Sequence, residues 1–311
     1  MSNILIIKHG SLGDIIQANG AMKDIKNNFR DHNVMLLTTT PYANLMSSCP
    51  YIDGVLIDQR LPRWNLFYLS KLKKMLLRFS FTKVFDLQNS SRTKFYKKFI
   101  FKDDTIWSDS QSFVSKEILL SEKELPVLER MKLQLERSGI SQTEFTKKPD
   151  LMWAIKNINN IVNQNFDGEF ILLFPFCSPK LVKKKWPYFN DLLKLLKRHY
   201  KSQYNIAIAP GPNEIHQSRE FDTNIILNKG LSLNLVELIS LIHKAKYIVS
   251  NDTGPAHICA HLNKKGLALF GSHTTPEKVS IETENFKCIT VKNLKNLNVA
   301  NVFEKVKEEL N

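Results

Sequence analysis

The stretch Ser250-Asn251-Asp252-Thr253-Gly254-Pro255-Ala256-His257 decides how the second half of the chain is interpreted. It follows a β-like run at 245–249 and leads into a helix-like run at 258–262. A strand that ends in a Gly-containing turn before a helix presents free backbone N–H groups and the positive end of the helix dipole to an anion. The stretch therefore predicts a phosphate-binding turn.

A comparable stretch lies near the N-terminus, where Lys8-His9-Gly10-Ser11-Leu12-Gly13-Asp14 again predicts a strand, a Gly turn and a helix. Short apolar runs such as 170–174 alternate with helical periods along the chain. Repeated β–α units form parallel sheets that bind ligands at the carboxyl ends of their strands. With 311 residues, the chain is expected to form two α/β domains that hold a ligand between them.

The composition is that of a globular protein, with 43% hydrophobic and 24% charged residues. Four scattered cysteines without a C-x-x-C pair favour a reducing compartment: Cys49, Cys177, Cys259 and Cys288. The N-terminal run 4–7 predicts a buried strand rather than a signal peptide, and no apolar run approaches the roughly 18 to 20 residues of a membrane span. We therefore expect a cytoplasmic protein.

The formal net charge of +14 is unevenly distributed. Between Arg60 and Lys102 there are twelve Lys or Arg residues and one acid, Asp86. Such a segment favours an anionic partner, which could be nucleic acid, anionic lipid or a phosphorylated substrate. It carries no helix-turn-helix, zinc-finger or RNP-like pattern, so a nucleic-acid-binding protein without catalysis is the alternative rather than the main hypothesis.

The polar, Asn-rich segment 143–168, with Pro149 near its start, predicts the domain boundary. We place an N-terminal domain at 1–160 and a C-terminal domain at 161–297, with its last strand at 266–270. The tail 298–311 is predicted to contain an amphipathic helix.

Several short motifs occur in a fixed order along the chain, in addition to the two Gly turns. They are Phe85-Asp86-Leu87-Gln88, Leu128-Glu129-Arg130, Lys184-Lys185-Trp186-Pro187 and Leu267-Ala268-Leu269-Phe270-Gly271. In this order and spacing they resemble glycosyltransferase family 9, the bacterial ADP-heptose:lipopolysaccharide heptosyltransferases, over nearly the whole chain. The resemblance implies the GT-B fold, with two Rossmann-like domains facing a central cleft. It also implies that the tail helix crosses back onto the N-terminal domain.

The resemblance implies an inverting transfer of a heptose from ADP-heptose to an inner-core sugar of lipopolysaccharide. Asp14 would be the catalytic base that takes the proton of the attacking hydroxyl. By residue type alone it could simply be an acid that complements the helix dipole. Lys184 would offset the charge that develops on the leaving ADP. Its alternative interpretation is a solvated basic loop.

The same resemblance assigns the remaining binding residues. On the donor side it implies diphosphate or sugar contacts from Ser178, Lys180, Asp252, Thr253, Gly254 and His257, although Asp252 and Thr253 are also good helix caps. Ribose and base contacts would come from Glu214 and Leu231. On the acceptor side it implies Ser11, Gly13, Arg60 and Arg63.

No D-x-D motif occurs, so we expect transfer without a metal and without another cofactor. The donor partner is expected to be of the ADP-heptose type and the acceptor an anionic glycolipid. The 60–102 segment would contact anionic lipid at the inner face of the inner membrane. The alternatives are another nucleotide-sugar donor in the same family and the nucleic-acid-binding protein named above.

Overall fold

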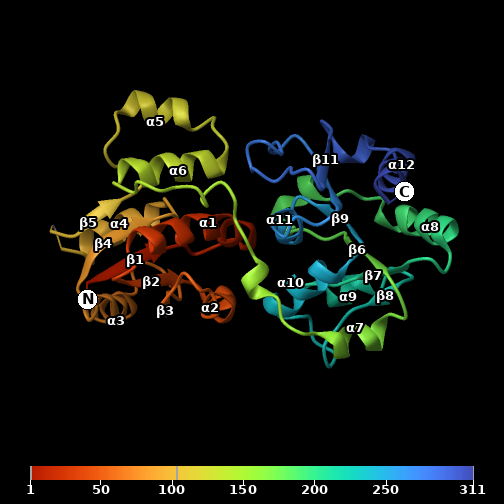
Figure 1. Cartoon of the computed structure of the whole chain (residues 1–311), viewed down its shortest axis with the longest axis horizontal. Coiled ribbons are helices and arrows are strands. Elements are labelled where there is room, and N and C mark those ends of the chain that lie inside the picture. The colour runs from red at the N-terminus through yellow and green to blue at the C-terminus, as the bar shows by residue number, and fades with distance from the viewer. Residues whose placement is uncertain (1, 103, 311) are drawn as a thin grey trace. The chain divides into compact units, whose positions relative to one another are not determined.

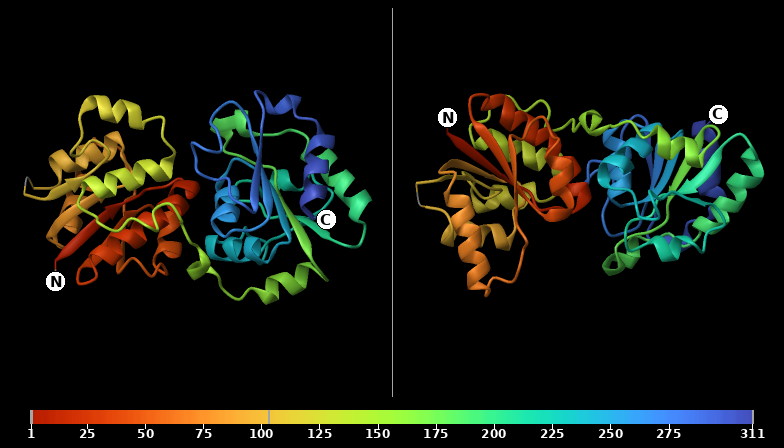
Figure 2. Two further views of the ribbon diagram at one scale, coloured as in Figure 1. Left: turned by 45° about the horizontal axis from the view of Figure 1, so that its top comes forward. Right: turned by 90° about the horizontal axis from the view of Figure 1, so that it is seen from below.

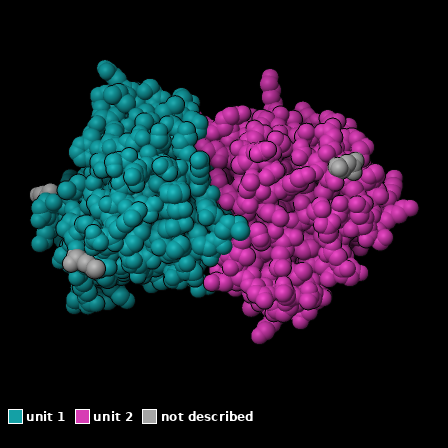
Figure 3. Space-filling view, in the orientation of Figure 1, with its two compact units in different colours: residues 1–153 teal, residues 154–311 magenta. Residues whose placement is uncertain are grey.

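The computed structural model describes residues 2–102 and 104–310. The chain divides into two compact units, Met1–Trp153 and Ala154–Asn311 (Figure 3). The division lies a few residues before the boundary after residue 160 that the sequence predicts. Each unit is built from alternating strands and helices around its own sheet (Figure 1).

Unit 1 contains a five-stranded sheet of order β3-β2-β1-β4-β5 in which every pairing is parallel. The strands are β1 (Asn3–Ile7), β2 (Asn33–Thr38), β3 (Gly54–Ile57), β4 (Phe81–Asp86) and β5 (Ile106–Ser108). The strand order reverses between β1 and β4. In open α/β sheets, ligands bind outside the carboxyl ends of the strands at such a switch point.

Helices cover both faces of this sheet (Figure 2). They are α1 (Leu12–Asn28), α2 (Thr40–Met46), α3 (Leu66–Leu77), α4 (Ser91–Phe99), α5 (Lys116–Glu122) and α6 (Val127–Arg137). On one face α3 and α4 bury Leu72, Leu76 and Tyr96 against strand side chains such as Leu5 and Val84. On the other face α1 packs against α6.

Unit 2 contains a six-stranded sheet of order β11-β10-β9-β6-β7-β8, again with only parallel pairings among the described residues. The strands are β6 (Phe170–Phe174), β7 (Asn205–Ile208), β8 (Asn224–Ile225), β9 (Tyr247–Asn251), β10 (Gly266–Phe270) and β11 (Phe286–Thr290). Here the order reverses between β6 and β9. The carboxyl ends of these two strands therefore define the switch point of this unit.

The helices of unit 2 are α7 (Asn159–Asn165), α8 (Phe189–Tyr200), α9 (Ile215–Ser218), α10 (Leu235–Lys244), α11 (Gly254–His261) and α12 (Val299–Leu310). Helix α12 is the amphipathic tail that the sequence predicts. Its Val302 and Val306 are buried in the core of unit 2 with α8 and Trp186. The apolar stripe of α12 therefore completes the core of unit 2. That the helix crosses back onto the N-terminal domain stays a prediction.

The prediction that 266–270 is the last strand is wrong, since β11 pairs with β10 in parallel. Strand β11 lies at the sheet edge, and of its five residues only Phe286 is fully buried. An edge strand with Lys287 and Cys288 at its centre lacks the continuous apolar run that marks the central strands. In the part of the chain that the structure describes, no helix has the length and apolar character needed to cross a bilayer.

Candidate active site

The first Gly turn joins β1 to α1 and carries Asp14 in the first turn of the helix. Ser11 precedes the helix, and its backbone N–H and side-chain hydroxyl donate hydrogen bonds to Asp14 Oδ2 at 2.6 and 2.9 Å. Both hydrogen bonds run from Ser11 to the same oxygen, and they fix the direction of the Asp14 carboxylate at the start of the helix. Asp14 remains partly exposed, so it keeps access to a substrate while it caps the helix.

Gly10 brings Tyr42 against this turn. Its φ of +108° favours glycine, and a Cβ at this position would lie 2.2 Å from Tyr42 Cε2. Burial raises the pKa of Tyr42, the charge of Asp14 raises it further, and Arg60 acts in the opposite direction. Asp14 and Arg60, both predicted site residues, are thus close enough to influence the same phenol.

Lys8 lies at the end of β1, buried beside a cavity of about 370 Å³. Its Nζ donates a hydrogen bond to the Leu87 carbonyl at 2.9 Å. Burial lowers the pKa of Lys8, while Asp14 and Asp86 act to raise it. The cavity is also lined by Gln88 and by three further cations, Lys123, Arg130 and Arg137. Arg137 forms an ion pair with Glu122, which is also in the wall. The switch point of unit 1 therefore has a polar, mainly cationic hollow.

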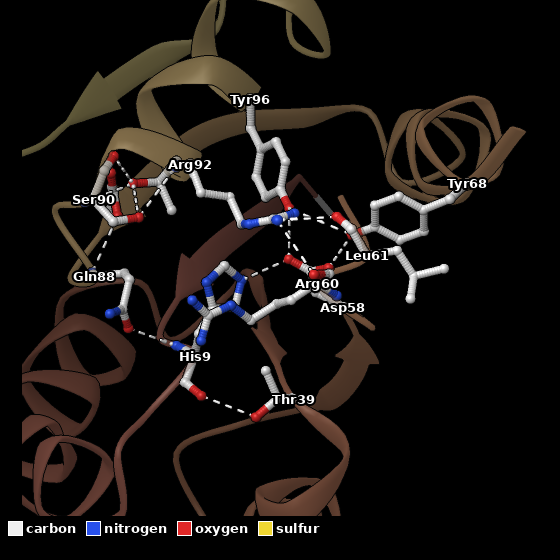
Figure 4. Close-up of polar contacts among 12 residues, drawn as sticks. His9, Thr39, Asp58, Arg60, Leu61, Tyr68, Gln88, Ser90, Arg92 and Tyr96 are labelled. Carbon is white, nitrogen blue, oxygen red and sulfur yellow. Dashed lines mark hydrogen bonds and ion pairs between the residues drawn. The ribbon is translucent and has the colours of Figure 1, made fainter. Parts of the chain in front are cut away.

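Behind the same turn, His9 enters a buried polar network around Asp58 (Figure 4). His9 Nε2 lies 3.0 Å from Asp58 Oδ2. The distance is that of an ion pair, although the ring nitrogen does not meet hydrogen-bond geometry. Tyr68 donates its hydroxyl to Asp58 Oδ1, and Tyr96 donates to Asp58 Oδ2 at 2.7 Å. Arg92 supports the network by donating to the Tyr96 hydroxyl at 3.0 Å.

These contacts keep Asp58 ionised inside the protein. Burial alone would raise its pKa, but His9 and the two tyrosine hydroxyls lower the pKa of Asp58 to about 2. The backbone of His9 is also held, because its N–H donates to Gln88 Oε1 at 2.8 Å and its carbonyl accepts from Thr39 at 2.9 Å. The network therefore fixes the turn that leads to Asp14.

In unit 2, Lys184 and Asp252 meet at the switch point between β6 and β9. Lys184 Nζ lies 2.6 Å from Asp252 Oδ2, and His273 Nε2 lies 2.8 Å from the same oxygen. His257 Nε2 is 3.8 Å from Asp252 Oδ1. Burial alone would raise the pKa of Asp252, but Lys184 and then His273 reverse this and hold it below its usual value.

The loop that carries Lys184 is fastened to the end of β9. The Trp186 N–H donates to Asn251 Oδ1 at 2.9 Å, and Asn251 Nδ2 donates to the Pro175 carbonyl at 2.9 Å. The Trp186 indole is buried in the core of unit 2 and donates to the Leu297 carbonyl. Gly271 also lies close to the loop, since a Cβ there would be 3.2 Å from the Lys183 carbonyl oxygen. These contacts explain why Lys184 has a defined position.

Helix α11 begins at Gly254, directly after Asp252 and Thr253. Thr253 is the N-cap residue in extended conformation, and its hydroxyl lies 3.3 Å from Ser250 Oγ and from the Asn251 carbonyl. Gly254, at the helix start, leaves the backbone accessible. The positive end of α11 and the Lys184 ammonium are therefore close together, which is an arrangement suited to an anion.

The other predicted donor-side residues have different surroundings. Glu214 follows β7; burial raises its pKa, and the Gly211 N–H, which donates to its Oε2 at 2.8 Å, partly offsets that rise. Ser178 and Lys180 are exposed in the loop before Lys184. Leu231 is 70% exposed, so it is available to a base.

The predicted acceptor-side residues also separate into two groups. Ser11 and Gly13 flank the start of α1. Arg60 follows β3 in the loop that contains Asp58. Arg63 is exposed, and its guanidinium lies 5.7 Å from the centre of the Phe95 ring. Arg63 therefore belongs to the basic surface of α3 and α4 rather than to the polar network at the turn.

Sequence reasoning missed His9, Tyr42, Asp58 and His273 as members of these sites. Their position was a usable signal, because His9, Asp58 and His273 each follow the end of a parallel strand within a few residues. Arg92, which belongs to the basic segment 60–102, donates instead to the Tyr96 hydroxyl and to the carbonyl of Leu61.

The sequence profile described as glycosyltransferase family 9 (heptosyltransferase) matches residues 69–307. The chain belongs to glycosyltransferase family 9. This matches the resemblance that the sequence motifs indicate and makes the protein a glycosyltransferase. A search of curated proteins finds no match to this family 9 glycosyltransferase.

Solved structures share its fold over nearly the whole length. Escherichia coli heptosyltransferase WaaC with ADP has a TM-score of 0.74 at 18% identity, with 99% of each chain covered. A family 9 glycosyltransferase from Veillonella parvula has a TM-score of 0.79 at 14% identity, with 99% of this chain and 97% of that chain covered. E. coli ADP-heptose lipopolysaccharide heptosyltransferase II gives 0.72 at 16% identity, with 100% and 98% covered. The predicted α/β, GT-B fold is confirmed.

Proposed function

We propose that this family 9 enzyme transfers a heptose from ADP-heptose to an inner-core sugar of lipopolysaccharide, with inversion and without a metal. The observation that carries the proposal is the cluster of Lys184, Asp252 and His273 next to the start of α11. It combines a fixed cation with a helix N-terminus, and both favour a diphosphate. The E. coli neighbours bound to ADP and to ADP-2-deoxy-2-fluoro heptose support the choice of donor.

In the proposed reaction an acceptor hydroxyl attacks the anomeric carbon as the bond from that carbon to the diphosphate oxygen breaks. Asp14 takes the hydroxyl proton, and ADP leaves with the bonding electrons. Lys184 uses the donors that Asp252 leaves free to offset the charge on the departing diphosphate. Asp252 orients Lys184, while Thr253, Gly254 and His257 complete the donor contacts together with Ser178 and Lys180.

The nucleoside of the donor would lie beside Glu214 and Leu231. A partly buried carboxylate after a strand suits ribose hydroxyls, as in other nucleotide-binding α/β folds. On unit 1, the cavity lined by Lys8 and Arg130 would hold an anionic group of the acceptor. Ser11, Gly13 and Arg60 would contact the acceptor at the loops after β1 and β3, and Arg63 would contact it from the basic surface of α3 and α4. The acceptor would be a glycolipid, so the enzyme would work at the cytoplasmic face of the inner membrane.

The first experiment is isothermal titration of the wild type and Lys184→Ala with ADP, UDP and GDP. We expect ADP-selective binding that Lys184→Ala weakens at least tenfold, because a charge-assisted contact contributes about 1.5–3 kcal/mol. Lys194→Ala is the matched control, since Lys194 is an exposed lysine of α8 outside the site. Selectivity for UDP or GDP would indicate another nucleotide-sugar donor. Binding of DNA or RNA without binding of any nucleotide would favour the nucleic-acid alternative.

Turnover then tests the chemistry. We expect ADP release from ADP-heptose to require a lipopolysaccharide acceptor, to persist in excess EDTA and to give a product of inverted anomeric configuration by NMR. Loss of activity in EDTA that Mg²⁺ restores would refute metal independence. Retention of configuration would refute a single displacement assisted by Asp14.

A further inference from the structure

Three apolar side chains stand exposed at the start of α3. Trp64, Leu66 and Phe67 are 80%, 76% and 83% accessible. The other three tryptophans of the chain are not comparably open, since Trp107 and Trp186 are buried and Trp153 is half-buried. Large apolar side chains gathered on a surface mark an interaction site, whereas single ones need no explanation.

The same helix carries a row of cations. After Phe67 come the cations Lys71, Lys74 and Arg78, at helical spacings of four, three and four residues. These spacings place the four side chains along one face of the helix. No carboxylate among the described residues forms an ion pair with Lys71, Lys74 or Arg78. The one acid between Arg60 and Lys102 is Asp86, and it is buried. The exposed charge of this segment is therefore entirely positive.

A hollow of about 450 Å³ lies beside this row. Its wall includes the three cations Lys71, Lys74 and Arg78, and apolar side chains that include Leu72 and Met75. A phosphate group would contact the cations, while the apolar wall would accept the adjoining carbon chain. A free phosphate ion has no carbon chain that could contact the apolar wall or the exposed Trp64 and Phe67.

We propose that this surface docks on an anionic phospholipid bilayer, with Trp64, Leu66 and Phe67 inserted among the headgroups. We call these three residues the apolar tip and Lys71, Lys74 and Arg78 the basic row. A tryptophan beside a basic helix face is the arrangement that interfacial binding favours. The proposal deepens the proposed function, because a membrane-borne glycolipid acceptor would lie in that bilayer.

Trp64 is a built-in reporter for this contact. The test mixes the full chain, without donor or acceptor, with vesicles of phosphatidylcholine alone or of phosphatidylcholine with 30% phosphatidylglycerol, a proportion chosen on the order of natural anionic lipid content. With anionic vesicles we expect a blue-shifted tryptophan emission, protection from acrylamide and quenching by brominated lipid chains. In Trp64→Phe the emission change should vanish while vesicle co-sedimentation persists.

Variants separate the two parts of the surface. Leu66→Ser with Phe67→Ser should lower vesicle affinity at least tenfold, whereas Ile118→Ser with Leu120→Ser, at exposed positions of α5, should leave it unchanged. Each Lys→Gln change in the basic row should cost about fivefold, since a basic residue near an anionic surface contributes about 1 kcal/mol. Circular dichroism checks that each variant is folded.

Several results would overturn the proposal: no emission change with anionic vesicles, equal binding to neutral vesicles, or full competition by free glycerol phosphate. Concentration-dependent dimerisation abolished by the Leu66 and Phe67 changes would instead assign the tip to a second copy of the chain. Because no nucleotide is present, failure here leaves the proposed transfer reaction untouched. Failure of ADP binding likewise leaves vesicle docking untouched.

Discussion

Asp14 and Asp252 each lie in a strand–turn–helix unit that borders the switch point of its sheet. Asp252 directly follows β9, and Asp14 lies in the first turn of α1, after β1. Asp252 is 2% exposed and contacts Lys184 and His273 through one oxygen. Asp14 is partly exposed. Among the described residues, it accepts hydrogen bonds only from Ser11 and forms no ion pair. One strand–turn–helix pattern thus produces two carboxylates with different chemistry.

The difference arises from what each turn brings to its acid. A buried carboxylate neutralised by a partly buried lysine orients that lysine and is poorly suited to accept a proton. A carboxylate held by hydroxyl and amide donors keeps lone pairs for a substrate proton. The comparison therefore assigns the proposed base to unit 1 and the proposed diphosphate site to unit 2.

The largest expected effect comes from removing the base. Asp14→Asn keeps the shape of the side chain but cannot accept the proton, so we expect kcat to fall about a thousandfold. ADP affinity and the melting temperature should change little. The measurement is ADP release under saturating donor and acceptor.

Asp191→Asn is the matched control, because Asp191 is also a first-turn acid, in α8, and is exposed. It should retain full activity. If Asp14→Asn were equally active, Asp14 would be only a helix-capping acid, and the distinction between the two carboxylates would fail.

The next effect is on stability in unit 2. Lys184→Met leaves Asp252 buried without its cation and should cost about 2–3 kcal/mol, less than a fully buried pair because Lys184 keeps 22% exposure. Adding Asp252→Asn removes the stranded charge, so the double variant should regain most of this loss. Urea unfolding of the two single variants and the double variant measures the coupling. Additive losses would show that the ion pair contributes nothing to stability.

The sequence predicts the fold well because the central strands are continuous apolar runs. Strands β6 and β10 begin and end where the pattern predicts. The edge strand β11 was not predicted, because its half-buried residues do not form a continuous apolar run. The tail helix was recognised as amphipathic, but amphipathicity does not specify which core receives the apolar face. That depends on α8 and Trp186, which are distant in sequence.

The candidate sites show the same limit. Lys184 and Asp252 were both predicted, and the structure brings them to 2.6 Å. His273 and Asp58 were not predicted: each follows a strand end, but that position alone does not specify which residue the side chain contacts. Only the alignment of strand ends in space brings His9 and Asp58 together. Pairs of this kind come from topology, which a one-dimensional pattern does not specify.

A pH experiment tests the buried acid of unit 1. The pKa of Asp58 in the folded protein is about 2, below its usual 3.8. The contribution of the Asp58 charge to the free energy of unfolding is therefore complete above about pH 4 and is lost as the pH falls towards 2. A pKa shift of this size corresponds to about 2 kcal/mol. Asp58→Asn should be less stable than the wild type by about this amount at neutral pH.

The stability difference between the wild type and Asp58→Asn should shrink as the pH approaches 2, which urea midpoints measured from pH 2 to pH 7 would show. Asp53→Asn is the control, because the Asp53 carboxylate is more exposed and its ion pair with Lys26 is near the surface. A constant difference between Asp58→Asn and the wild type at all pH values would mean that Asp58 acts through packing rather than through its charge.

The smallest effect concerns Glu214, a further carboxylate that follows a strand. Burial raises the pKa of Glu214, and the one N–H that donates to it, from Gly211, partly offsets that rise. If it binds ribose hydroxyls, Glu214→Gln should weaken ADP about tenfold and leave pyrophosphate binding unchanged, because one hydrogen bond to a charged group contributes about 1.5 kcal/mol or more. Glu220→Gln, at an exposed position after α9, is the control. Equal weakening of ADP and pyrophosphate would assign Glu214 to the shape of the Gly211 turn instead, and the nucleoside would then need another anchor in unit 2.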